Sequence, residues 1–81
     1  MTITVKTHDD GSVFTAETPE QLVGLLWKDA FIRESTPDQY MSAVARRVKL
    51  WNGHVVRDDD ATLFLLDLES AGLIDVEWST D

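Results

Sequence analysis

The stretch Thr18-Pro19-Glu20-Gln21 is repeated, with one acid exchanged for the other, as Thr36-Pro37-Asp38-Gln39. Both copies have the composition of a helix start. The threonine hydroxyl accepts a hydrogen bond from a backbone N–H of the first turn, and proline fits the first helical position. The acid interacts favourably with the positive end of the helix dipole, and the glutamine side chain reaches back to the backbone N–H at the cap. The segments that follow differ, because residues 22–27 are apolar almost all round whereas residues 40–47 are amphipathic. The repeat therefore predicts two helix starts and not a duplicated site.

These starts and the stop signals behind them predict three helices, over residues 19–32 or 33, 37–51 and 61–71. In the second helix an apolar stripe ends at Trp51, and Asn52-Gly53 supplies a left-handed stop. Asp58-Asp59-Asp60 offers capping carboxylates and favourable charge for the third helix. Gly72 fits the position after the cap of a helix that ends in a Schellman motif.

The two ends of the chain have the pattern of strands. Asp10-Gly11 is a strong signal for a two-residue hairpin turn, which would place Thr7 opposite Phe14 and gather the apolar residues on one face. Residues 74–78 alternate apolar and polar side chains, so they predict a strand that joins the hairpin. A short extended piece is expected at residues 54–56.

Together these elements predict a single compact α+β domain over residues 1–81. The order is β-β-α-α-(short β)-α-β: an N-terminal hairpin, three helices, and a C-terminal strand that completes a small antiparallel or mixed sheet. A chain of 81 residues, 43% of them hydrophobic, is long enough for one core. No second domain is expected.

Composition excludes several classes of protein. There is no cysteine, so disulfides, thiol catalysis and the usual structural zinc sites are ruled out. No apolar run approaches the roughly 20 residues of a membrane span, and the N-terminus has no signal-peptide pattern, so we expect a cytoplasmic protein. The net charge of −8 opposes binding to nucleic acid and to anionic membrane surfaces.

No constellation of side chains indicates catalysis, a cofactor or a metal. Asp58-Asp59-Asp60 lacks the alternating ligands, the central glycine and the distal glutamate of a calcium loop. His8 and His54 lie in predicted strand or turn positions, and no arrangement around either indicates a nucleophile, an orienting group and an oxyanion site. We therefore expect neither enzymatic activity nor a bound cofactor or metal.

Residues 65–74 resemble the end of the third helix in winged-helix proteins, where LxxLExxGLI leads into the wing. The resemblance implies a helix that reads DNA, which needs Arg, Lys, Asn or Gln directed at bases and phosphates. The predicted helix carries Asp67 and Glu69 and no basic residue, so direct DNA binding is not expected. A degenerate winged-helix regulator that acts through protein contacts is one functional alternative.

Basic residues gather in the middle of the chain. The group, which no acidic residue interrupts, is Arg46, Arg47, Lys49 and Arg57. One interpretation is a binding site for an anion or an acidic partner. The other is that a helix C-terminus favours cations and that these side chains pair with the surrounding acids.

Two of the predicted helices carry more apolar residues than one buried stripe uses. In the third helix Leu63 and Leu66 point away from the core face, and in the first helix Phe31 lies outside it. Either the third helix is enclosed on both sides, or these side chains form part of an exposed patch for a partner or a homodimer.

The sequence thus favours a small, acidic, non-enzymatic module for protein–protein interaction. It would act as an adaptor or inhibitor, as small bacterial or phage proteins of this composition often do, and bind an unknown protein or a second copy of itself. An alternative is an acidic mimic of nucleic acid that occupies a basic DNA-binding protein.

Overall fold

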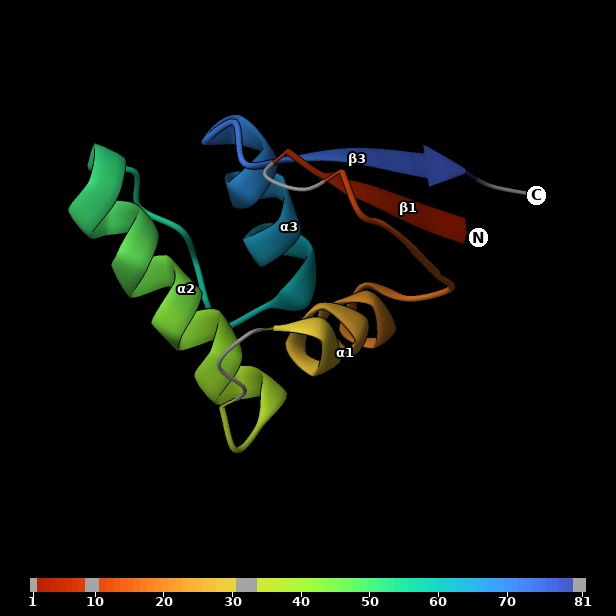
Figure 1. Cartoon of the computed structure of the whole chain (residues 1–81), viewed down its shortest axis with the longest axis horizontal. Helices are drawn as coiled ribbons and strands as arrows, with labels where there is room; N and C mark the ends of the chain where they lie inside the picture. Colours follow the sequence, from red (N-terminus) through yellow and green to blue (C-terminus); the bar gives the residue numbers. More distant parts are fainter. Residues whose placement is uncertain (1, 9–10, 31–33, 80–81) are drawn as a thin grey trace.

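The computed structural model describes residues 2–8, 11–30 and 34–79, and it has the predicted α+β fold (Figure 1). Its elements, in chain order, are β1 Thr2–Thr7, β2 Val13–Ala16, α1 Pro19–Asp29, α2 Pro37–Asn52, α3 Ala61–Ser70 and β3 Ile74–Ser79. The strands form an antiparallel sheet in the order β2-β1-β3, so the C-terminal strand joins the hairpin as predicted. α1 and α3 pack against the sheet, and α2 packs on α1.

The two repeated tetrapeptides begin α1 and α2. Thr18 Oγ1 accepts from the Gln21 N–H at 3.1 Å, and Thr36 Oγ1 accepts from the Gln39 N–H at 3.2 Å. Gln21 also reaches back, because its Oε1 accepts from the Glu17 N–H at 3.2 Å. The prediction that the repeat marks two helix starts is confirmed.

α1 is shorter than predicted. The helix ends at Asp29, because Ala30 already has an extended backbone. The indole N–H of Trp27 donates to the Glu34 carbonyl oxygen at 2.6 Å, which ties the connection to α2 back against α1. The predicted continuation to residue 32 or 33 falls on residues 31–33, which lie outside the described part of the chain.

α2 and α3 end as their glycines predict. Gly53, at the cap of α2, has a φ of 77°. After α3, the Gly72 N–H donates to the Glu69 carbonyl oxygen at 3.0 Å and the Leu73 N–H donates to the Leu68 carbonyl oxygen at 3.1 Å. This pair of bonds is the Schellman motif.

The hairpin turn is longer than predicted. Val5 lies opposite Phe14, and the Thr7 N–H donates to the Ser12 carbonyl oxygen at 2.9 Å, so the predicted pairing of Thr7 with Phe14 is wrong. Four residues, 8–11, separate Thr7 from Ser12, and residues 9 and 10 lie outside the described part of the chain. Because the register moves by two residues and side chains alternate with a period of two, the predicted apolar face is kept.

Residues 54–56 form no strand, which corrects the expected short β segment. The sheet contains three strands among the described residues. Val56 is buried in the core, and the backbone N–H of Arg57 donates to Asp67 Oδ2 at 2.9 Å. A carboxylate of α3, and not a neighbouring strand, thus pairs with the backbone of this segment.

The core lies between the inner face of the sheet and the helices. Its buried side chains are Ile3, Val5, Leu22, Val23, Leu26, Met41, Val48, Val56, Ala61, Phe64, Leu65, Leu68 and Ile74. Trp51, which was predicted at the end of the buried stripe of α2, is exposed instead. The last turn of α2 lies at the periphery of the molecule, where no other element covers it (Figure 1).

Candidate interaction surfaces

Large apolar side chains are exposed where α2 ends. Leu50, Trp51 and Val55 have the highest exposed fractions of the large hydrophobic residues in the described part of the chain, at 80%, 77% and 72%. The left-handed turn at Gly53 reverses the chain, so that Val55 returns alongside the end of the helix. Sequence reasoning missed Leu50 and Val55. The available signal was that Leu50 lies off the buried stripe and next to several cations.

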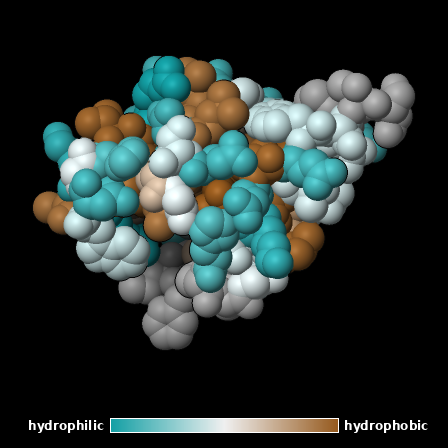
Figure 2. Space-filling model, turned by 90° about the horizontal axis from the view of Figure 1, so that it is seen from above, coloured by the Kyte–Doolittle hydropathy of each residue, from teal (hydrophilic) through white to brown (hydrophobic). Residues whose placement is uncertain are grey.

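Three cations surround these apolar side chains. Arg46 and Lys49 line a groove of about 340 Å³ together with Val55 and Val56, and Arg47 lies one turn before Trp51. In Figure 2, apolar and polar groups alternate on the side of the molecule where α2 lies. We call this surface the α2-end patch, which consists of Arg46, Arg47, Lys49, Leu50, Trp51 and Val55.

Of the four basic residues that the sequence grouped together, one forms an ion pair with a described residue and three do not. Arg57 Nε donates to Asp67 Oδ2 at 2.8 Å, and Arg57 Nη2 donates to Asp67 Oδ1 at 3.0 Å. The hydrogen bonds from Arg57 lower the pKa of Asp67 to about 2, and the same contact raises the pKa of Arg57. By contrast, Arg46, Arg47 and Lys49 form no ion pair with any residue that the structure describes. Arg57 thus has a structural role, and the other three cations of the predicted group have no ion-pair partner among the described residues.

The predicted apolar surface is only partly assembled. Leu66 is 38% exposed and Leu63 is half-buried, whereas Phe31 lies outside the described residues. The opposite face of α3, with Phe64 and Leu65, is buried as expected. α3 is therefore not enclosed at Leu66, and a role of these residues in association stays a prediction.

A second surface is the outer edge of β2. Hydrogen-bonded and non-hydrogen-bonded pairs alternate along an antiparallel ladder. Because the Thr7 N–H donates to the Ser12 carbonyl oxygen, this alternation directs the backbone N–H and C=O groups of Val13 and Thr15 away from β1. The edge of the sheet is open at these two residues.

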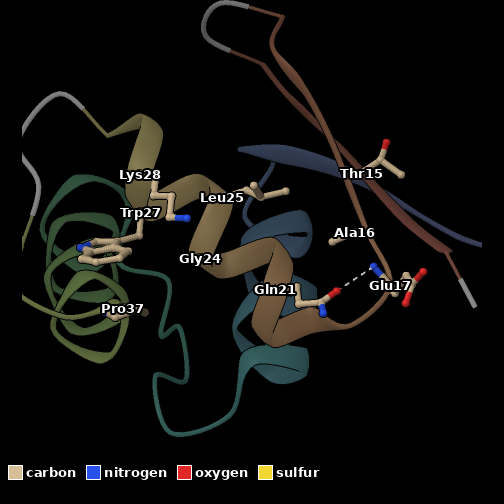
Figure 3. A pocket seen from close by; sticks show the side chains of 9 residues that line it. All are labelled: Thr15, Ala16, Glu17, Gln21, Gly24, Leu25, Trp27, Lys28 and Pro37. Carbon is tan, nitrogen blue, oxygen red and sulfur yellow. Dashed lines mark hydrogen bonds between the residues drawn. The ribbon is translucent and has the colours of Figure 1, made fainter.

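A groove of about 660 Å³ lies between this edge and α1 (Figure 3). We call it the β2–α1 groove. Its lining residues are Thr15, Ala16, Glu17, Gln21, Gly24, Leu25, Trp27, Lys28 and Pro37. Figure 3 shows Leu25 pointing from α1 toward the hairpin, with Lys28 and Glu17 at opposite ends of the groove.

One backbone group at the outer edge of β3 has a side-chain partner. Glu69 Oε2 of α3 accepts from the Val76 N–H at 2.9 Å. On the other side of β3, where the chain that follows β1 meets it, His8 Nδ1 lies 2.7 Å from the Gly72 carbonyl oxygen and His8 Nε2 lies 3.0 Å from Asp75 Oδ2. The hydrogen bond with Asp75 is the main cause that raises the pKa of His8 above 6.5. Since both partners of the imidazole are acceptors, the protonated ring satisfies both.

One residue of the acidic triplet, Asp60, caps α3. Asp60 Oδ1 accepts from the Leu63 N–H at 3.1 Å, as predicted for the start of α3. Within the described residues, no three His, Asp or Glu side chains are grouped so that they could hold a metal ion.

Comparison of the chain with protein-family models, with curated proteins and with solved structures finds no match. None of the helices in the described ranges is both long enough and apolar enough to cross a membrane.

Proposed function

We propose that the protein is a non-enzymatic interaction module that binds an acidic protein partner through the α2-end patch. The observation that supports this proposal is the high exposure of Leu50, Trp51 and Val55 beside three cations that have no ion-pair partner among the described residues.

The patch has the chemistry of a protein interface. Trp and Arg are enriched among residues that dominate binding energies, and an exposed apolar centre with a charged border is the usual anatomy of such a surface. The chain as a whole has a net charge of −8, so cations gathered in one place select their partner by charge. The partner should therefore present carboxylates around an apolar group.

Affinity purification from the source cells tests this proposal. We expect a specific acidic protein to be retained by the wild-type protein and lost with Trp51→Ala and with the double change Arg46→Glu and Lys49→Glu. Lys6→Glu is the matched control for the charge reversal, because Lys6 is also an exposed cation but lies outside the patch. It should retain the same protein.

Other outcomes identify other functions. A retained protein that is lost equally with Lys6→Glu would contradict a role of the patch. A basic DNA-binding protein, retained by the α2 variants and lost when the exposed acids are changed, would instead support the acidic mimic of nucleic acid.

A further inference from the structure

We infer that the β2–α1 groove binds an extended segment of a partner protein, which pairs with β2 as a fourth strand of the sheet. The groove shares no residue with the α2-end patch, so this site is distinct from the proposed one. With both sites occupied, the protein would bridge two ligands, as an adaptor does.

The open edge of β2 supplies the backbone groups. Val13 and Thr15 direct N–H and C=O groups away from β1, and no hydrogen bond reaches these outward groups from a described residue. An extended chain fits these outward backbone groups, because an added strand forms a hydrogen bond with each N–H and C=O in turn. β2 has four residues, so the bound stretch is short.

The second observation that favours this site is the glycine at position 24 of α1. Glycine in the interior of a helix is less stable than alanine. No atom lies within 4 Å of the position that a Cβ would take at Gly24, so the packing of this chain gives no reason for glycine there. Close approach of another backbone along the groove gives such a reason.

The side chains around the groove indicate what the segment contains. Val13 is 60% exposed on the outer face of the sheet and Leu25 is 37% exposed on the inner side, so a strand with apolar side chains on both faces covers both. Lys28 forms no ion pair with a described residue, and Glu17 lies at the far end of the groove. The segment is therefore apolar, with a carboxylate at the Lys28 end.

A phage-displayed library of random eight-residue peptides, panned against the whole protein, tests the inference. We expect enrichment of apolar peptides that carry an acid. A synthetic copy of the most enriched peptide should shift the amide resonances of Val13, Thr15 and Gly24 in NMR spectra. Enrichment of no sequence, or shifts confined to other residues, overturns the inference.

Variants give matched controls for this peptide. Thr15→Pro removes one outward N–H and should weaken binding about tenfold, whereas Thr15→Ala keeps that N–H and should change affinity less than about twofold. Gly24→Ala should also weaken binding, because its methyl group fills the floor of the groove while α1 keeps its stability.

Three results contradict the inference. Equal affinities of Thr15→Pro and Thr15→Ala would show that the outward N–H is not used. Wild-type affinity of Gly24→Ala would show that nothing approaches α1 closely, and this variant decides the question if Thr15→Pro does not fold. Dimerisation in sedimentation experiments that Thr15→Pro abolishes would place a second copy of the chain at the edge.

Discussion

The two edges of the sheet differ in whether a side chain forms a hydrogen bond with their outward backbone groups. At the β3 edge, the Glu69 carboxylate of α3 accepts a hydrogen bond from the Val76 N–H. At the β2 edge, no side chain of the described residues occupies the outward backbone groups.

An open strand edge is a template for pairing with another chain, and proteins usually cover it or charge it. Here α3 carries the carboxylate that accepts from one outward N–H of the β3 edge. The β2 edge lies beside a groove instead, and α1 lines this groove with a glycine and a half-exposed leucine. We therefore place the proposed partner segment on the β2 side of the sheet.

The largest effect of a substitution on stability is expected within α3, the helix that packs against β3. Leu65→Ala should lower the free energy of unfolding by about 2–5 kcal/mol, because Leu65 is fully buried. Leu66→Ala, at the neighbouring and exposed position, should cost less than about 1 kcal/mol. Urea denaturation of the two variants measures the difference. Equal losses would mean that α3 is enclosed on both faces.

Removal of the carboxylate at the β3 edge should have the next largest effect. Glu69→Ala leaves the half-buried Val76 N–H without its charged acceptor, which should cost about 1.5–3 kcal/mol of stability. Glu77→Ala removes an exposed acid from the same strand and should change stability by less than about 0.5 kcal/mol. If both variants unfold at the same urea concentration, the hydrogen bond between Glu69 and the Val76 N–H does not stabilise the protein.

A gain in stability is expected on the β2 side. Gly24→Ala should raise the free energy of unfolding by about 0.5–1 kcal/mol, because alanine favours the helix and the Cβ meets no atom within 4 Å. Gly53→Ala is the matched control and should destabilise the protein, because Gly53 has a φ of 77°. Thermal unfolding compares them, and a loss of stability for Gly24→Ala would contradict the open groove.

The smallest effect concerns His8. Folding raises its pKa above 6.5, so the contact with Asp75 and Gly72 stabilises the fold fully below that pH and is lost as the pH rises through the higher pKa of the folded state. The contribution is small, because His8 and Asp75 are exposed and water screens them. An NMR titration should show a lower His8 pKa in Asp75→Asn; an unchanged value would contradict the contact.

Much of the fold could be predicted, because its signals are local. The threonine caps act within one helical turn, and the glycine stops at Gly53 and Gly72 need only their own backbone conformation. The alternation in β3 gave the correct face and strand. The hairpin register was wrong, because the length of the turn, which includes the two residues outside the described part, is not set by Asp10-Gly11 alone.

The candidate surfaces were less predictable than the fold. Trp51 was expected in the core, since helical periodicity says which residues share a face but not where the neighbouring elements stop. The pairing of Arg57 with Asp67 joins residues from a connecting segment and a helix, and it could be recognised only after both were placed. The β2–α1 groove likewise needs the positions of two elements at once.

The sequence by itself determined the order of helices and strands, their caps and their apolar faces, because these depend on interactions within a few residues along the chain. The tertiary structure alone decided which edge of the sheet receives a side-chain hydrogen bond, which cations are paired and which apolar side chains are exposed. Those outcomes depend on distances between elements that are far apart in sequence, and such distances are set by the packing of the whole core.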